Sequence, residues 1–341
     1  MKQINRNLRE VAKIAGVSLS TASRVFSNSA NVSEDLRIRV LTASAQIGYQ
    51  PRELVRSQNG TLALNRVVLY IRTQMHQGLP GILGSFYGYV LQGIERECRN
   101  RGLTMLFAHN DGSGLSAADI ERFNLDDGTG MLLMGLFTPD DIALVQQYVR
   151  PVVLLNNVID MPVDTIVPDY YGGARLAIRH LAAAGHRQIA YLNGRERYTT
   201  RQRLAGYLDA LREASIPHDP KLITECSMSA HSGHDAVQQL LQRDVAFTAL
   251  FCVNDVSAVG ALTALSEAGC RPGHDMSVVG FDDVDVSDIT RFKLTTVQAP
   301  KAYMGTLAVR RLQERLVDPD SPAQHITLGV KLIERETVHR L

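Results

Sequence analysis

The feature of this sequence that most restricts its fold is a regular alternation that begins at Arg66. Short runs rich in β-branched and aliphatic residues recur along the chain: RVVLYI, LTMLFA, GMLLM, PVVLL, QIAYL, FTALFCV and MSVVGF. Amphipathic segments separate them, near residues 86–101, 139–148, 172–184, 201–213, 232–243, 255–268 and 301–316. Such alternation is typical of parallel sheets covered by helices on both faces. We therefore expect an α/β fold for residues 66–341.

Residues 1–49 follow a different pattern, in which the apolar spacing is helical only. Gly16 suits the end of a first helix, and Ser18 can cap a second helix over Leu19–Phe26. A third helix is expected at about 34–47. Three short helices with a tight glycine-containing turn predict a small all-α helix-turn-helix domain, whose second helix enters the major groove of DNA. A plain three-helix bundle with a solvated polar face is the alternative.

The charge of the chain is divided between the same two parts. The whole chain has 36 basic and 35 acidic side chains, a net charge of +1. Residues 1–60 hold nine basic and four acidic side chains, a net charge of +5, which leaves −4 for residues 61–341. A basic head on a mildly acidic body favours a nucleic-acid-binding module joined to a second function. Segment 50–65 is polar, contains Pro and Gly, and is the predicted hinge or linker.

Composition excludes several classes of protein. No apolar run reaches the roughly 18 residues needed to cross a bilayer, and the N-terminus lacks a signal peptide. The four cysteines lie far apart and the histidines show no metal-ligand spacing, which predicts a reduced cytoplasmic protein without disulfides, metal or cofactor. An enzyme on a nucleotide-binding α/β fold would need a glycine-rich phosphate loop after the first strand. Neither GxGxxG nor GxxxxGK[ST] occurs there.

The head resembles a known family. The run LREVAKIAGVSLSTASRVFSNSANVSEDLRIRVLTASAQIGYQP is similar to the DNA-binding head of the lactose/galactose-repressor (LacI/GalR) family, through VAKIAGVS, STASRV, NVS and IGYQP. The resemblance implies base contacts from Leu19, Ser20 and Arg24, and phosphate or sugar contacts from residues nearby. The full set of expected contacts in the head is Ser18, Leu19, Ser20, Thr21, Ser23, Arg24, Asn31, Ser33 and Tyr49.

The family also folds a short hinge helix on DNA and inserts a leucine into the minor groove, which kinks the duplex. This segment corresponds to 52–59, where Gln58 stands at the position of the usual leucine. Two alternatives stay open: Leu54 or Val55 replaces the leucine, or the protein bends its operator less. The expected hinge contacts are Arg52, Leu54, Val55 and Gln58.

The resemblance continues through the body. The matching elements are F-Y-x5-G-I-E from Phe86, PVVLLNN, GGARLAIRHLAAAGHRQIAYLNG, RLAGYLDAL, FCVNDVSAVGAL, VVGFDD and LTTV. They imply a core like that of periplasmic binding proteins, in which two α/β lobes hold a small molecule at the carboxyl ends of their strands. We expect lobe 1 at about 66–165 and 298–330 and lobe 2 at about 168–292, with crossings near 165–168 and 292–297.

Carried over residue by residue, the resemblance names candidate effector contacts. Arg203 matches an arginine that clasps effector hydroxyls or carboxylates, and Asn254 and Asp282 match ligand-binding residues at strand ends. Each has a structural alternative: Arg203 on a helix surface, Asn254 as a helix cap, and Asp282 in a turn. The full set of expected effector contacts is Arg72, Phe86, Asn156, Arg195, Arg197, Arg203, Met228, Asn254 and Asp282.

Two positions depart from the family pattern and bear on the effector. Asn156 replaces the aspartate of many relatives, and Met228 stands where several relatives place an aromatic ring that stacks on a sugar. Arg195 and Arg197 precede Arg203 by a few residues in the sequence, and Arg72 follows the first predicted strand. All three add positive charge to the expected effector site. One hypothesis is therefore an anionic effector, such as a sugar phosphate or a sugar acid. The alternative is a solvated basic loop.

Together these features predict a transcription regulator, most consistent with a repressor, that is controlled by a sugar or sugar derivative. A homodimer would place two heads on a pseudo-palindromic operator with half-sites about one helical turn apart. The chain ends soon after KLIERETV without a heptad-patterned tail, which favours a dimer over a tail-linked tetramer. The alternatives are an architectural DNA-binding protein without a ligand and, with less support, an enzyme. Induction and co-repression are equally compatible with the sequence.

Overall fold

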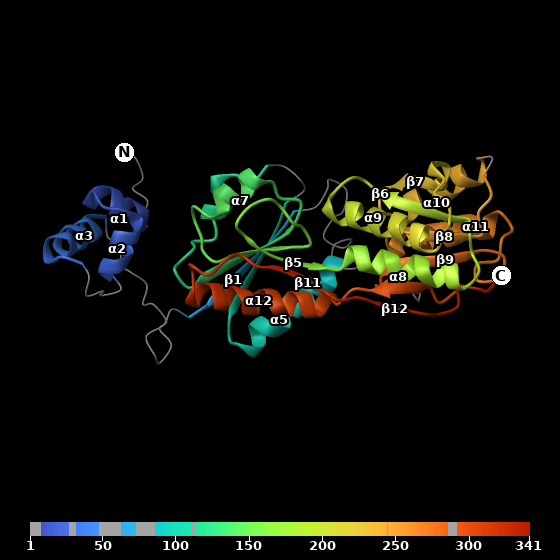
Figure 1. Cartoon of the computed structure of the whole chain (residues 1–341). Coiled ribbons are helices and arrows are strands. Elements are labelled where there is room, and N and C mark those ends of the chain that lie inside the picture. Colours follow the sequence, from blue (N-terminus) through green and yellow to red (C-terminus); the bar gives the residue numbers. More distant parts are fainter. Residues whose placement is uncertain are drawn as a thin grey trace.

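In a computed structural model of the chain, three parts follow one another: a helical head and two α/β lobes (Figure 1). The C-terminus lies in the second lobe, at the end of the molecule away from the head. The structure describes residues 8–26, 32–47, 63–72, 86–110, 114–243, 245–285 and 292–341.

The head consists of α1 (Leu8–Ala15), α2 (Leu19–Phe26) and α3 (Glu34–Ile47), which confirms the predicted helices. Its core is made by the apolar faces of all three helices. The buried residues are Val11, Ala12, Ala15, Ala22, Val25, Val40, Ala43 and Ile47. Gly16 has a φ of +64°, the left-handed conformation that ends α1 and that glycine adopts without a steric penalty.

The first lobe is built on a six-stranded parallel sheet in the order β11-β5-β4-β3-β1-β2. The strands are β1 (Arg66–Arg72), β2 (Thr104–Asn110), β3 (Thr129–Gly135), β4 (Val152–Leu155), β5 (Asp164–Pro168) and β11 (His325–Leu328). Helices α5 (Phe86–Asn100) and α12 (Lys301–Val317) bury one face of this sheet. Helices α6 (Ala117–Glu121) and α7 (Pro139–Val145) bury the other.

The second lobe repeats this arrangement with the order β12-β10-β9-β8-β6-β7. The strands are β6 (Ile189–Gly194), β7 (Ile223–Cys226), β8 (Ala249–Cys252), β9 (Ser277–Asp282), β10 (Thr295–Gln298) and β12 (Lys331–Ile333), of which β12 is antiparallel to β10. Helices α8 (Tyr170–Ala183) and α9 (Tyr198–Glu213) cover one face. Helices α10 (Ala230–Leu241) and α11 (Asp255–Glu267) cover the other, and η1 (Pro220–Leu222) precedes β7.

The chain passes between the lobes at three places. It leaves β5 for α8, leaves β10 for α12, and leaves β11 for β12. The chain returns to the first lobe close to the expected residue 298, but residues 295–297 are not part of the crossing, because Thr295–Gln298 pairs with β9 inside the second sheet and the crossing follows Gln298. The third crossing was not predicted. It returns residues 331–341 to the second lobe, where the amide of Leu341 donates to the carbonyl of Ala184 at 2.9 Å.

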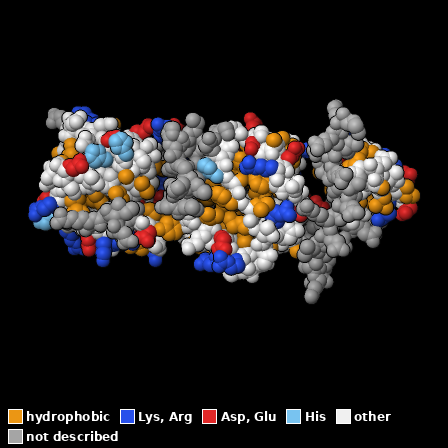
Figure 2. Space-filling model, turned by 180° about the vertical axis from the view of Figure 1, so that it is seen from behind, with side chains coloured by type: hydrophobic (Ala, Val, Ile, Leu, Met, Phe, Trp, Pro, Cys, Tyr) orange, Lys and Arg blue, Asp and Glu red, His pale blue; other side chains and the backbone are white. Residues whose placement is uncertain are grey.

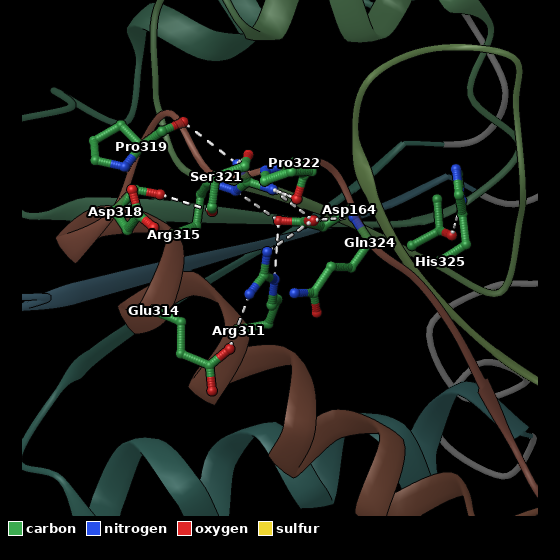
Figure 3. A network of polar contacts seen from close by, with 11 residues as sticks. Asp164, Arg311, Glu314, Arg315, Asp318, Pro319, Ser321, Pro322, Gln324 and His325 are labelled. Atoms are coloured by element: carbon green, nitrogen blue, oxygen red, sulfur yellow. Dashed lines mark hydrogen bonds and ion pairs between the residues drawn. The ribbon is translucent and has the colours of Figure 1, made fainter.

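A buried ionic network fixes α12 to the sheet of the first lobe (Figure 3). Asp164 at the start of β5 accepts hydrogen bonds from the guanidinium groups of Arg311 (3.3 Å) and Arg315 (2.8 Å) on α12, and from the amide of Gln324 (2.7 Å). Burial raises the pKa of Asp164, but these three donors outweigh it and hold the pKa below its usual range. The network therefore ties one crossing strand, α12 and the segment before β11 together.

The surface of the two lobes carries charges of both signs. In the view of Figure 2, Lys and Arg side chains alternate with Asp and Glu side chains over both lobes, with hydrophobic side chains between them. No helix among the described residues is long and apolar enough to cross a membrane. In that same part of the chain, no group of three or more His, Cys, Asp and Glu side chains could hold a metal ion.

Candidate DNA-reading surface and effector site

Helix α2 has one buried and one exposed face. Ala22 and Val25 are buried against the rest of the head. Ser18 in the preceding turn, together with Leu19, Ser20 and Arg24 on the helix, is exposed, and Leu19 is 42% exposed although it is apolar. A solvent-facing leucine beside small hydroxyls and an arginine suits close approach to base edges and phosphates.

Ser18 has a structural role in addition to its place on this surface. Its Oγ accepts a hydrogen bond from the amide of Thr21 at 3.1 Å, which confirms the predicted cap of α2. Its hydroxyl also lies 2.8 Å from that of Thr21 and 2.9 Å from that of Ser20. These contacts orient the first turn of the helix, where the expected base contacts begin.

Two basic residues of the head bind its own backbone, which the sequence analysis did not foresee. Arg39 on α3 donates to the carbonyl of Ala15 at 2.6 Å, and Arg37 donates to the carbonyl of Val25 at 3.4 Å. Both carbonyls lie at the ends of helices, where unpaired oxygens and the helix dipole favour a cation. Part of the +5 charge of the head therefore holds the three helices together.

Of the remaining expected DNA contacts, most lie outside the described residues. Ser33 is exposed just before α3, and its carbonyl accepts from the amide of Arg37 at 3.0 Å. The side chain of Ser23 is not described. The following positions lie outside the described residues: Asn31, Tyr49, Arg52, Leu54, Val55 and Gln58.

A small cavity lies between the two lobes, where the carboxyl ends of their strands meet. The first lobe contributes residues that follow β3 and β4, and the second contributes the loop between β6 and α9. The lining residues are Tyr87, Gly135, Leu136, Asn156, Asn157, Arg197, Tyr198 and Thr199. Their amides and hydroxyls can both donate and accept hydrogen bonds, and the guanidinium of Arg197 adds donors, which suits a ligand rich in hydroxyls.

Arg203 lies in the interior of the second lobe, one turn of α9 after the lining residue Thr199. Only 3% of it is exposed, so the alternative of a helix-surface arginine is wrong. Its Nη2 lies 3.3 Å from Oδ1 of Asp282, and its guanidinium carbon lies 4.3 Å and 4.2 Å from the ring centroids of Tyr170 and Phe281. Its Nε is buried and has no hydrogen-bond partner among the described residues. A buried N–H without a partner is costly, so it marks a position for an acceptor from elsewhere.

Asp282 combines the two roles that the sequence left open. Its carboxylate binds Arg203, and its backbone turns with a φ of +101°, followed by Asp283 at +53°. Burial raises the pKa of Asp282, which outweighs the opposing effects of Arg203, Lys301 and Arg197. Asp283 faces away from this pair, toward Arg335 at 2.7 Å.

A tyrosine joins Asn156 to the same cluster. The hydroxyl of Tyr170 donates to Oδ1 of Asn156, and the Tyr170 ring packs against the guanidinium of Arg203. Burial raises the pKa of Tyr170 above its usual range, so the hydroxyl stays a donor. Tyr170 was not predicted. Its sequence signal is the Tyr-Tyr pair directly after the first crossing.

Arg197, Met228 and Asn254 form a second group beside the cavity. The guanidinium of Arg197 donates to Sδ of Met228, and Nδ2 of Asn254 donates to the carbonyl of Met228 at 3.2 Å. Oδ1 of Asn254 accepts from the amide of Ser257 at 2.9 Å, which confirms the alternative that Asn254 caps the following helix. Both Asn254 polar groups are therefore engaged within the protein.

Three expected effector contacts are not brought to this cluster. Arg72 at the end of β1 is paired with Asp141 of α7 at 2.5 Å. Arg195 is exposed and lies 3.6 Å from Glu225, and Phe86 is buried in the core of the first lobe. The sequence could not distinguish these arginines from Arg197, because each lies at or just after the carboxyl end of a parallel strand.

Six lining residues were missed by the sequence analysis: Tyr87, Gly135, Leu136, Asn157, Tyr198 and Thr199. Tyr87 follows Phe86, and the two rings meet edge to face at 6.0 Å, so the buried ring positions the one that lines the cavity. The Oγ1 of Thr199 is buried without a partner among the described residues, and Thr199 lies one helical turn before Arg203 on α9. The spacing of four residues between Thr199 and Arg203 was the available sequence signal, because residues four apart lie on the same face of a helix.

Comparisons with known proteins agree with both parts of the structure. Residues 7–52 match the family of bacterial regulatory proteins named lacI, and residues 178–338 match the periplasmic binding protein-like domain. The HTH-type transcriptional repressor PurR of Proteus mirabilis is 31% identical over 347 residues, which cover 97% of this chain and 96% of that repressor.

Solved structures give the same result over nearly the whole chain. The Lac repressor dimer bound to operator and the anti-inducer ONPF has a TM-score of 0.71 and 27% identity, covering 98% of this chain and 99% of that one. A complex of the transcriptional regulator CelR with cellobiose has a TM-score of 0.69 and 27% identity, covering 98% and 100%. The expected head and two-lobed core are thereby confirmed. The chain belongs to the lacI family of bacterial regulatory proteins and is a DNA-binding transcriptional repressor with an effector-binding domain, not an enzyme.

Proposed function

We propose that this repressor binds a sugar or a sugar derivative between its lobes, in the cavity beside Arg203. The observation that carries the proposal is the buried Nε of Arg203, which has no partner among the described residues. Arg203 lies one turn of α9 after Thr199, which lines a cavity together with amides and hydroxyls. A sugar hydroxyl or carboxylate would supply the missing acceptor. The complex of a related regulator with cellobiose supports this class of ligand.

We further propose that charge on the effector is recognised by Arg197. Of the four arginines considered, Arg72 and Arg195 have acidic partners outside the cavity, and Arg203 is neutralised in part by Asp282. Arg197 lines the cavity and its guanidinium contacts the sulfur of Met228, which is a weak acceptor. A phosphate or carboxylate on the ligand would be a far stronger partner for that guanidinium.

Calorimetry on the full chain tests both statements. The panel comprises neutral monosaccharides and disaccharides, their phosphates, the corresponding sugar acids, and purine bases as heteroaromatic competitors. Arg203→Ala should abolish binding of the best compound, and Arg197→Ala should weaken only charged compounds, with Arg195→Ala as the matched control. Tight binding of a neutral sugar, with an affinity that Arg197→Ala does not change, would exclude the anionic effector. Selective binding of a purine base would exclude a sugar altogether.

For the DNA side, we propose that residues 1–49 read an operator, that 50–65 form the hinge, and that 66–341 bind effector and dimerise. The bases would be contacted by Leu19, Ser20 and Arg24, which lie on α2 and are all exposed. A homodimer would bind a pseudo-palindromic operator in the cytoplasm, as supported by the Lac repressor dimer bound to its operator. Sedimentation of the free chain as a stable tetramer would contradict the dimer.

Effector control requires that the ligand favours one arrangement of the lobes over another. Measuring affinity for an in-vitro-selected operator with and without the best compound would show release or tightening. If no compound of a broad metabolite panel shifts the melting temperature, the second candidate function, DNA binding without a ligand, would replace this one.

A further inference from the structure

A buried lysine of the first lobe holds a turn of the second. Lys301 is the first residue of α12 and is 6% exposed. Its Nζ donates to the carbonyl oxygens of Asp282 and Asp283, the latter at 2.8 Å. We call these two residues the Asp282–Asp283 turn.

A tyrosine of the first lobe reinforces this contact. Tyr89 on α5 accepts a hydrogen bond through its hydroxyl from the amide of Asp285 at 2.8 Å. Its ring centroid lies 5.0 Å from Nζ of Lys301, a distance at which an ammonium is attracted to an aromatic face. The amide of Val284, between these contacts, instead donates to Asp255 of the second lobe. The turn is therefore held from both lobes at once.

The Asp282–Asp283 turn has an unfavourable backbone conformation. Both residues have positive φ, +101° and +53°, and neither is glycine. Such conformations persist only where surrounding contacts enforce them. Here the enforcing contacts are the ammonium of Lys301 on the two carbonyls and the Asp285 amide on Tyr89.

The same turn reaches the effector site through its side chain. The carboxylate of Asp282 binds Arg203, while the carbonyl of Asp282 accepts from Lys301. One residue therefore contacts the proposed effector-binding arginine of the second lobe and the end of a helix of the first lobe. A change in the position of Asp282 must alter one contact or the other.

Helices α5 and α12, which carry Tyr89 and Lys301, are packed too closely to move separately. A Cβ at Gly93 of α5 would lie 1.9 Å from the carbonyl oxygen of Ala302, and one at Gly305 would lie 2.2 Å from that of Val90. The two backbones are thus in direct contact. Toward its other end, α12 accepts a hydrogen bond at Oε1 of Gln313 from the amide of Leu64, at 3.0 Å, near the end of the predicted linker 50–65.

We infer that Lys301 is a positioning residue that sets the Asp282–Asp283 turn against Arg203 and couples that turn, through α12, to Leu64 at the end of the predicted linker. The inference rests on the proposed function in so far as Arg203 binds the effector. It assigns to α12 the link between the effector site and the chain leaving the head. Lys301 itself has no contact with the cavity among the described lining residues.

The test uses hydrogen–deuterium exchange on the full chain, resolved to single amides, and affinity for DNA selected in vitro with the wild-type chain. Lys301→Met keeps the apolar stem but removes the three donors. It should speed exchange at Asp285 by about tenfold or more, since a hydrogen bond to a charged group is lost beside it. It should also change the affinity for the selected DNA by a factor of at least about three. In free energy this is roughly half of a tenfold change in affinity.

Two further variants separate positioning from general stability. Tyr303→Ala, 51% exposed on the same helix, should leave both measurements unchanged. Lys301→Arg, which restores a charged donor, should return both toward the wild-type values. If Lys301→Met does not fold, Tyr89→Phe removes the single bond to the Asp285 amide and should speed exchange at that amide and across the Asp282–Asp283 turn.

Wild-type exchange and wild-type DNA affinity in Lys301→Met would overturn the inference, as would wild-type exchange across the Asp282–Asp283 turn in Tyr89→Phe. The inference would also be contradicted if Lys301→Met folds and shows both changes but Lys301→Arg shows the same changes instead of values near the wild type. The exchange measurement needs no effector. If no compound binds, the proposed function is contradicted, but the exchange measurement still tests the role of Lys301.

Discussion

The guanidinium of Arg203 and the carboxylate of Asp282 form an ion pair inside the second lobe, with Nη2 and Oδ1 3.3 Å apart. Both side chains are almost wholly buried, and the rings of Tyr170 and Phe281 cover the guanidinium. Removing one partner of such a pair strands the other charge away from water. The pair is therefore important for stability as well as for the proposed ligand site.

Arg203→Ala should cost about 3–5 kcal/mol of unfolding free energy, because it leaves Asp282 buried without its partner. Chemical denaturation monitored by circular dichroism measures the loss. The double variant Arg203→Met with Asp282→Asn should recover most of the stability but none of the effector binding. Arg195→Ala, which is exposed, should change stability by no more than about 0.5 kcal/mol. A stable Arg203→Ala chain would show that the pair is dispensable.

Arg24→Ala should weaken binding to the selected operator by about 1–3 kcal/mol and reduce discrimination against random DNA. Its exposure on α2, next to Leu19 and Ser20, provides the reason. Fluorescence anisotropy on specific and random duplexes gives both affinities. Arg271→Ala in the second lobe removes the same charge far from the head and serves as control. Equal loss on both duplexes would assign Arg24 to a phosphate instead of a base.

Asp164→Asn should destabilise the first lobe by about 3–5 kcal/mol, since Arg311 would keep its charge inside the protein without a carboxylate. Because the pKa of Asp164 is lower when folded than when unfolded, its contribution is present above an unfolded value of about 3.9. It is lost as the pH falls through the lower folded value. Denaturation of wild type and variant between pH 3 and 7 should therefore converge at the acidic end.

The control for this network is Glu314→Gln. Glu314 binds Arg311 at 3.0 Å from the exposed side of α12, so its removal should cost at most about 1 kcal/mol. Figure 3 shows Glu314 approaching Arg311 on the side away from Asp164. Parallel pH profiles for wild type and Asp164→Asn would contradict the role given to this carboxylate.

Asp255→Asn should make the stability of the chain less sensitive to a rise in pH from 5 to 8. Burial raises the pKa of Asp255 to about 8, against hydrogen bonds from Thr296 and the Val284 amide, which lower it. A carboxyl with a raised folded pKa stabilises fully below its unfolded pKa, and this contribution is lost as the pH rises through about 8.

Wild type should thus lose stability relative to Asp255→Asn across pH 5–8, by at most about 1.4 kcal/mol per pH unit. Thermal unfolding at pH 5, 6, 7, 8 and 9 checks the slope. The difference between the two curves should level off above pH 8. A constant difference from pH 5 to 9 would mean that Asp255 stays ionised in the folded chain.

Much of the fold was predictable because local pattern and architecture agree. The helical spacing in the head placed α2 at Leu19–Phe26, and the alternation after Arg66 indicated two helix-covered parallel sheets. The third crossing was not predictable, since β11 and β12 are short and each half exposed. Their pairing with β5 and β10 depends on residues more than 30 positions away.

The candidate site was only partly predictable. Motif positions led to Arg203, Asp282 and Asn156, which the fold brings together through Tyr170. The same reasoning could not separate Arg197 from Arg72, because both lie at or just after the carboxyl end of a parallel strand. Their side-chain partners decide the difference: Asp141 binds Arg72 away from the cavity, whereas Arg197 lines it.

By itself the sequence indicated the family, through the motifs of its head and body, and the division into a basic head and an acidic body. It also determined the short helix whose outer face we propose reads DNA. The division and the helix follow from short-range patterns, namely helix caps, periodicity and charge, which need no knowledge of distant contacts. Tertiary structure alone decided which arginines serve the cavity, that Arg203 is buried against two rings, and that Lys301 holds the Asp282–Asp283 turn. Burial and pairing are properties of side chains from separate strands and helices, and only the packed lobes bring those side chains within hydrogen-bond reach.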